Sequence, residues 1–85
     1  MQRVEIYTTP FCPYCHAAKR LLAAKGAHFE ETDVSQSADL RQKMTARAGG
    51  RRTVPQIFIG GRHVGGSDEI HALDHAGKLD ALLAG

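Results

Sequence analysis

Two hydrophobic patterns alternate along the 85 residues of this chain. Short runs of apolar and β-branched residues predict strands, whereas apolar residues that recur every three or four positions predict helices. The runs place strands at about residues 3–8, 27–33, 53–59 and 62–65. The helical spacings place helices at about residues 13–25, 35–48 and 78–84, with one more helix that begins at residue 67.

The ends of these helices carry residues that usually begin and stop helices. Pro13 suits a first helical position, because the N–H that it lacks would have no acceptor there. Gly26 supplies a stop for the same helix. Ser35 or Ser37 is expected to cap the second helix and Ser67 the third, since a serine hydroxyl accepts from the unpaired amides of a first turn.

The apolar positions of the helices are expected to form the core together with the strands. Most of them follow an i, i+3, i+4 spacing, which places them on one face of their helix. The helical residues expected to be buried are Ala18, Leu21, Leu22, Leu40, Met44, Ile70, Leu73, Leu79, Leu82 and Leu83. The strand at 27–33 is the weakest prediction, because Phe29 is its single large apolar residue.

The order of elements, β-α-β-α-β-β-α, predicts the topology of the sheet. The first two strands are joined by a helix and should be parallel, through a right-handed crossover. Gly60-Gly61 should form a two-residue hairpin that makes the last two strands antiparallel. We therefore expect an α/β fold in which residues 1–85 form one domain, a four-stranded mixed sheet flanked by helices on both faces.

Composition and charge narrow the function classes. The net charge is only +2, from 11 basic and 9 acidic residues, which argues against a nucleic-acid partner. No apolar stretch approaches the roughly 18 residues of a membrane span, and no basic segment followed by an apolar run suggests a secretory signal. We expect a cytoplasmic protein, and a monomer, because the core uses the large apolar faces.

The two cysteines carry the candidate chemistry. Cys12 and Cys15 are the only cysteines, and they lie where a strand turns into a helix. The unpaired amides and the dipole of a helix N-terminus favour a negative sulfur, and the thiolate is the attacking species in thiol–disulfide exchange. A bridge between them would close too small a loop to stabilise a fold. The pair therefore indicates redox chemistry at Cys12.

Basic residues cluster between positions 41 and 52. The cluster consists of Arg41, Lys43, Arg47, Arg51 and Arg52. Two interpretations stay open at this point: a solvated helix face and loop, or a patch that receives small anionic carboxylates.

Three motifs in the predicted order of elements identify a resemblance. They are Cys12-Pro13-Tyr14-Cys15, Thr53-Val54-Pro55 and Gly65-Gly66-Ser67-Asp68. Together they resemble a glutaredoxin of the dithiol class over essentially the whole chain. The resemblance implies a thioredoxin-like fold, glutathione as the electron donor, and protein disulfides or glutathione mixed disulfides as substrates. We expect no metal.

The resemblance also implies roles for the first motif. Cys12 matches the nucleophile of the family, and Cys15 matches the thiol that resolves the mixed disulfide. Pro13 and Tyr14 would limit the freedom of the loop and present a flat apolar surface beside the sulfur. Tyr14 could equally be a partly exposed aromatic at the start of a helix.

The other two motifs would bind glutathione. The resemblance implies a cis peptide bond before Pro55, which would leave the backbone of Thr53-Val54 free to pair with the cysteinyl part of glutathione. The amides at Gly66-Ser67 would hold the γ-glutamyl carboxylate, and the Asp68 carboxylate would take the ammonium group. Simple helix capping by Ser67-Asp68 is the alternative.

The chain departs from the family pattern at two places. Thr9 stands where many members carry a lysine that attracts the glycyl carboxylate of glutathione. Arg51 or Arg52, which follow Gly49-Gly50, could supply the missing charge, or both could be solvated.

Three other functions remain to be weighed. A thioredoxin-like donor fed by a flavoprotein reductase would not need residues 65–68. A cluster-binding module would hold a [2Fe–2S] centre between two copies of Cys12 and two glutathiones. A zinc site from Cys12, Cys15, His71 and His75 has the right ligand types but far from compact spacing.

Overall fold

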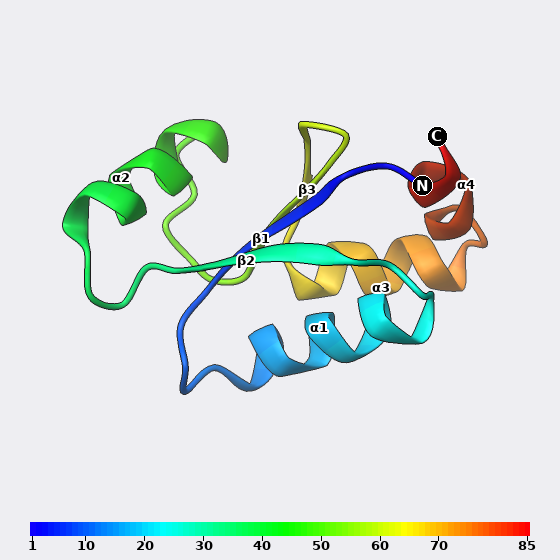
Figure 1. The fold of residues 1–85 in the computed structure, drawn as a ribbon, viewed down its shortest axis with the longest axis horizontal. Helices are drawn as coiled ribbons and strands as arrows, with labels where there is room; N and C mark the ends of the chain where they lie inside the picture. Colours follow the sequence, from blue (N-terminus) through cyan, green and yellow to red (C-terminus); the bar gives the residue numbers. More distant parts are fainter.

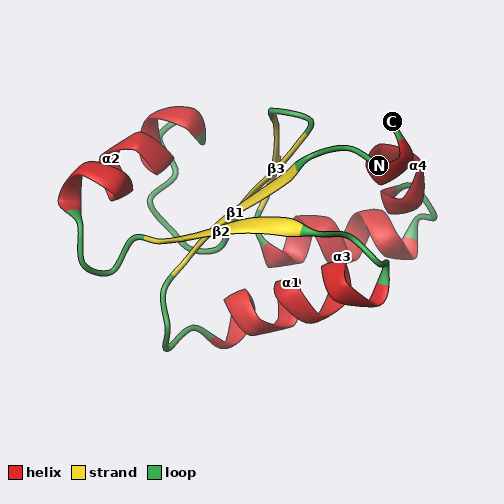
Figure 2. Ribbon diagram, viewed as in Figure 1, coloured by secondary structure: helices red, strands yellow, loops and turns green.

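The computed structural model describes residues 1–85 and contains four strands and four helices (Figure 2). In chain order these are β1 (Val4–Thr8), α1 (Pro13–Ala24), β2 (Phe29–Asp33), α2 (Ala38–Arg47), β3 (Gln56–Ile59), β4 (Arg62–Gly65), α3 (Ser67–His75) and α4 (Leu79–Ala84). The predicted order of elements is confirmed. No helix is long and apolar enough to cross a membrane.

The strands form one mixed sheet in the order β2-β1-β3-β4. β1 is parallel to β2 and antiparallel to β3, and β3 is antiparallel to β4. Gly60 and Gly61 connect the last two strands with φ angles of 61° and 78°, the left-handed conformation that a two-residue turn of this kind requires. The mixed sheet and its hairpin are therefore as the sequence predicts.

Helices cover both faces of this sheet (Figure 1). On one face α1 and α3 lie side by side, with α4 beside the end of α3, and these helices enclose the larger core cluster. That cluster consists of Val4, Ile6, Ala18, Leu22, Ala27, Ile57, Ile59, Ile70, Leu79 and Leu83. On the other face α2 covers a smaller cluster of Tyr7, Val34, Met44, Ala48 and Phe58.

α2 is fixed to the sheet by a charged side chain as well as by its apolar ones. The Arg47 guanidinium lies 4.0 Å from the centre of the Phe58 ring. The same group donates to the Glu5 carboxylate at 2.9 Å and to the Tyr7 hydroxyl at 3.1 Å. Arg47 therefore joins the end of α2 to β1 and β3.

One predicted core residue is exposed. Leu40 was expected to be buried with Met44, but its exposed fraction is 37%, and that prediction is wrong. The sheet residues beneath α2 pack against Met44 and Ala48, which lie one and two turns later. The first turn of α2 extends beyond the sheet, so Leu40 follows the apolar spacing of the helix but has no core beside it. Ser37, and not Ser35, caps this helix by accepting from the Leu40 amide at 3.2 Å.

Candidate active site

Cys12 is the residue that caps α1. Its backbone is extended, with φ −125° and ψ 104°, and Pro13 follows as the first helical residue. The Sγ atom accepts a hydrogen bond from the Cys15 amide at 3.1 Å. A sulfur in this position receives an otherwise unpaired N–H and the positive end of the helix dipole, both of which favour a thiolate.

The two sulfurs lie in different surroundings. Cys12 is 8% exposed, whereas Cys15 is completely buried. Burial, and then the hydrogen bond with Cys12, raises the pKa of the Cys15 thiol to about 12. At neutral pH Cys15 is therefore protonated, and Cys12 is the sulfur that a disulfide in solution can reach.

A loop before β3 faces the cysteines. The peptide bond between Val54 and Pro55 is cis, which confirms the expectation drawn from the resemblance. The Val54 carbonyl oxygen lies 3.8 Å from Cys12 Sγ. The Val54 amide donates to no acceptor in the protein, so it is available to a bound molecule.

A cleft of about 220 Å³ opens beside this loop. It is lined by Tyr14, Arg51, Thr53, Val54, Pro55, Gly66, Ser67, Asp68 and Glu69. The fold thus brings together parts of α1, the loop before β3 and the start of α3. All the predicted binding residues line the cleft except Arg52. Thr9, which stands where many family members carry a lysine, does not line it either.

α3 begins in a different way from the one expected. Its cap is Gly66, and Ser67 is the first helical residue, so the prediction that Ser67 caps this helix is wrong. The Gly66 amide donates instead to the Glu69 carboxylate at 2.8 Å. A β-carbon at Gly66 would lie 3.2 Å from the Pro55 carbonyl oxygen, so glycine lets α3 start close to the loop.

Glu69 is a site residue that the sequence reasoning missed. Its carboxylate accepts from the Gly66 amide and from the Arg51 guanidinium, and the Gly66 bond, followed by Arg51, lowers the pKa of this carboxyl. The pair with Arg51 joins two walls of the cleft. A glutamate three residues after a helix cap is a recognisable signal, because its side chain commonly reaches back to the cap amide.

With this geometry described, the comparisons with known proteins identify the family. The sequence profile of the glutaredoxin family matches residues 4–64. The chain belongs to the glutaredoxin family. Glutaredoxin 3 of Escherichia coli strain K12 is 53% identical over 83 residues, which cover 98% of this chain and 99% of the relative.

Two solved structures agree with this assignment. The solution structure of glutaredoxin from Brucella melitensis has 58% identity and a TM-score of 0.86, and covers 98% of this chain and 89% of that one. The crystal structure of a buckwheat glutaredoxin–glutathione complex has 30% identity and a TM-score of 0.87, and covers 98% of this chain and 77% of that one. The fold is therefore thioredoxin-like, as expected.

The activity follows from the family. This glutaredoxin is a glutathione-dependent thiol–disulfide oxidoreductase. Its relatives favour neither the thioredoxin-like electron donor nor the cluster-binding module.

A buried polar chain supports the loop of the glutaredoxin from behind. Gln56 is completely buried, and its Nε2 donates to the Thr53 carbonyl at 2.9 Å and to the Thr53 hydroxyl at 3.2 Å. Its Oε1 lies 2.7 Å from His63 Nε2, which donates to it. Burial, and then Arg51, lowers the pKa of His63, so the ring is neutral at pH 7. The only sequence signal was a glutamine inside an apolar strand.

The zinc alternative finds no group of ligands in the structure. His71 Nδ1 is 2.7 Å from the Ser67 carbonyl oxygen, to which it donates. No group of three or more His, Cys, Asp or Glu side chains is placed to share a metal ion.

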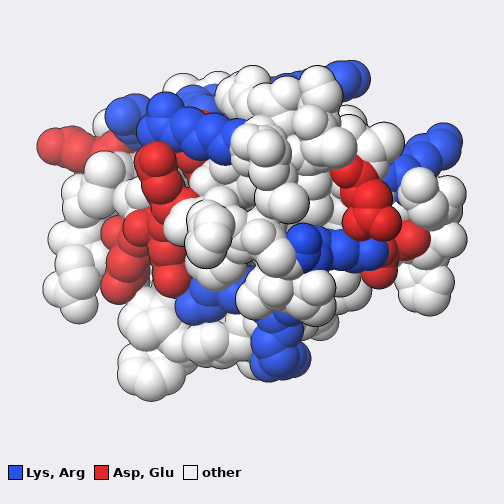
Figure 3. Space-filling view, turned by 45° about the vertical axis from the view of Figure 1, so that its right-hand side comes forward, with Lys and Arg blue, Asp and Glu red and all other residues white.

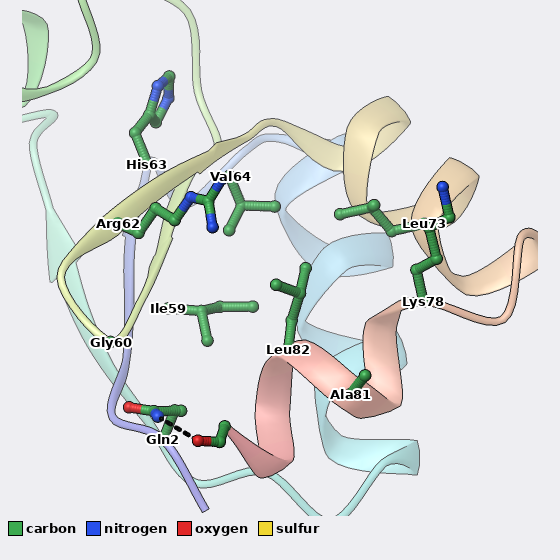
Figure 4. A pocket seen from close by; sticks show the side chains of 11 residues that line it. Gln2, Ile59, Gly60, Arg62, His63, Val64, Leu73, Lys78, Ala81 and Leu82 are labelled. Carbon is green, nitrogen blue, oxygen red and sulfur yellow. Dashed lines mark hydrogen bonds between the residues drawn. The ribbon is translucent and has the colours of Figure 1, made fainter.

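The largest cavity, of about 620 Å³, lies between the β3–β4 hairpin and helices α3 and α4 (Figure 4). Its floor is apolar, from Ile59, Val64, Leu73 and Leu82, and none of the predicted site residues lines it.

Proposed function

We propose that Cys12 is the attacking thiolate of this glutaredoxin and that Cys15 is the thiol that resolves its mixed disulfides. The observation that carries this proposal is the difference between the two sulfurs. Cys12 caps a helix and is partly accessible, while Cys15 is buried with its pKa raised to about 12. A reagent from solution can therefore reach the Cys12 sulfur, whereas the Cys15 thiol is buried and protonated.

In the dithiol route the Cys12 thiolate attacks one sulfur of a substrate disulfide. A Cys12–substrate bond forms, the substrate disulfide breaks, and the other substrate sulfur leaves as a thiolate. Cys15 then attacks the Cys12 sulfur, and its proton ends on the departing substrate sulfur. Two glutathiones reduce the resulting Cys12–Cys15 bridge and become glutathione disulfide.

In the monothiol route Cys12 takes the glutathionyl group from a mixed disulfide and releases the substrate thiol. A second glutathione then attacks this group, forms glutathione disulfide and regenerates the Cys12 thiolate. Cys15 is not needed, so the two routes differ in their dependence on this residue.

The cleft is the proposed binding site for glutathione. The unpaired Val54 amide would pair with the cysteinyl part in the manner of an added strand. The first-turn amides of Ser67 and Asp68 have no acceptor within α3 and would bind the γ-glutamyl carboxylate, while the Asp68 carboxylate would bind the ammonium group. The position of Arg51 in the cleft supports Arg51 over Arg52 as the partner of the glycyl carboxylate.

The expected setting of this chemistry is the cytoplasm, where reduced glutathione is abundant. The proposed substrates are disulfide-containing and glutathionylated proteins, and the protein is expected to act as a monomer formed by one domain over residues 1–85.

A coupled assay tests the proposal. Wild type, Cys12→Ser and Cys15→Ser are compared with glutathione, glutathione reductase and NADPH, using a small glutathione mixed disulfide as substrate. We expect NADPH loss with wild type and Cys15→Ser, and none above background with Cys12→Ser. Turnover by Cys12→Ser would show that the nucleophile is misassigned, and wild-type turnover supported only by thioredoxin reductase would refute the use of glutathione.

A further inference from the structure

A third hollow, a groove, lies behind the loop that borders the proposed glutathione cleft. Its volume is about 550 Å³, and it lies between α2 and the segment 50–52. The lining residues are Ala38, Arg41, Gln42, Thr45, Ala46, Gly50 and Arg52. Gly50 and Arg52 line this groove, whereas Arg51, between them, lines the cleft. One stretch of backbone is therefore the wall between the two.

The charged side chains that line this groove are all basic. Arg41 and Arg52 contribute two guanidinium groups, and no acidic side chain lines the groove. Arg41 Nη2 donates to the Arg52 carbonyl at 2.9 Å, which fixes the first guanidinium beside the second residue. Neither arginine forms an ion pair with a carboxylate.

Five of the other basic side chains form ion pairs with carboxylates, whereas Arg20, Lys43, Arg62 and Lys78 form none. Arg51 pairs with Glu69, Arg47 with Glu5, and Lys25 with Asp74. On the face that Figure 3 shows, basic and acidic side chains likewise lie beside one another. The groove thus leaves two arginines without carboxylate partners, next to the active site.

We propose that this groove binds an acidic segment of the protein substrate that is attacked by Cys12. The inference rests on the proposed function, because it requires a polypeptide joined to Cys12 through a disulfide. Arginine is suited to the task, since its planar guanidinium binds carboxylates through paired hydrogen bonds. The Gln42 side-chain amide offers a further donor and acceptor for the backbone of such a segment, and the Thr45 hydroxyl, which donates to the Arg41 carbonyl, can still accept.

The groove is within reach of a substrate on Cys12. Val54, whose carbonyl oxygen lies 3.8 Å from Cys12 Sγ, is two residues along the chain from Arg52. An extended polypeptide covers about 3.3–3.6 Å per residue, so an acidic residue within about four positions of the substrate cysteine spans this separation. Small glutathione mixed disulfides carry no such segment and do not reach the groove.

Two glutathionylated peptides test the proposal. They share one sequence, except that one carries glutamates and the other glutamines at the positions that flank the cysteine. Wild type, Arg41→Gln/Arg52→Gln and Arg20→Gln/Lys43→Gln are compared by kcat/KM. The last variant is the matched control, because it also removes two positive charges, from exposed residues that do not line the groove. A small glutathione mixed disulfide is measured in parallel.

For wild type and the control, we expect kcat/KM at low salt to be roughly tenfold higher with the acidic peptide than with the glutamine peptide. This is the effect expected of two exposed charge pairs acting together. The groove variant should lose this preference and keep its turnover of the small substrate. An equal preference in all three proteins, or an equal loss in the control, would overturn the proposal. Failure of wild type on the small substrate would refute the proposed function instead, so the two are tested separately.

Discussion

At the scale of single residues, the site depends on two sulfurs that the fold treats unequally. Cys12 and Cys15 have the same chemistry in a free peptide, where each would titrate near the ordinary cysteine value. In the folded protein Cys15 is completely buried in the first turn of α1, and its pKa is raised to about 12. The proposed reactivity of Cys12 therefore rests on the burial of Cys15 and on the position of Cys12 at the helix cap.

This difference predicts selective alkylation. pH 8 lies well below the raised pKa of Cys15, so the Cys15 thiol is almost entirely protonated there. Treating the reduced protein with iodoacetamide at pH 8 should give a single adduct, located on Cys12 by peptide mass spectrometry. In urea both cysteines should react. A first adduct on Cys15 in the folded protein would contradict this assignment.

At the scale of elements, the loop between α2 and β3 depends on one buried side chain of β3. Gln56 donates to Thr53 twice, and His63 donates to Gln56. These bonds fix the backbone that carries Val54 and borders the cleft. If glutathione binds in the cleft as proposed, Gln56 positions the backbone that it contacts, although Gln56 does not line the cleft itself.

Gln56→Met should reveal this role, because methionine has a similar volume and no hydrogen-bonding amide. Leaving the Thr53 carbonyl and the His63 ring without partners should cost about 1–3 kcal/mol of stability. We expect KM for a glutathione mixed disulfide to rise about tenfold, while the alkylation rate of Cys12 stays unchanged, since α1 is untouched. The control Gln56→Glu keeps an acceptor for His63 but loses the donor to Thr53, so its KM should rise too. An unchanged KM in Gln56→Met would disprove the positioning role.

Periodicity and motifs predict these elements better than they predict the contacts between them. Cys12, Pro13 and the hairpin glycines act through local backbone geometry, so the sequence alone indicates their roles. Leu40 fits the helical pattern of α2, but its burial depends on how far the sheet extends beneath the helix. Gln56 was missed because its bond with His63 joins two strands, and no local pattern records such a contact. Glu69 could have been found from its spacing to Gly66, but Ser67 was expected to be the cap, and its second partner, Arg51, lies on another segment.

At the scale of the whole molecule, the sheet separates the site-bearing helices from α2. α1 and α3 on one face carry Cys12, Cys15 and the start of the cleft, while α2 on the other face supports the loop from behind. The contact of Arg47 with Glu5 and Phe58 joins α2 to the sheet. The strength of this contact therefore affects the loop between the two hollows.

Glu5→Gln and Arg47→Met test this connection through stability. Each should lower the free energy of unfolding by about 1–2 kcal/mol at pH 7, measured by urea denaturation. Arg47 lowers the pKa of Glu5 in the folded protein, so this stabilisation is present above the ordinary pKa of a glutamate and is lost as pH falls through the lowered one. The gap between wild type and Glu5→Gln should close with acidification. A gap that stays constant as the pH falls until Glu5 is protonated in the folded protein would show that the gap does not come from the ionised pair.

The placement of Cys12 at the start of α1 has a consequence beyond nucleophilicity. The sulfur that we propose to react, Cys12 Sγ, is also the acceptor that closes the first turn. A thiolate accepts the Cys15 amide more strongly than a disulfide sulfur does. This one hydrogen bond therefore stabilises both the folded state and the reduced state, so the folding and reduction equilibria are linked by a thermodynamic cycle. Through this contact the native state favours the reduced protein over the oxidised one, and by the same free energy the folded bridge is a stronger oxidant than the same bridge in an unfolded chain. Any change that loosens the first turn of α1 would weaken both preferences together.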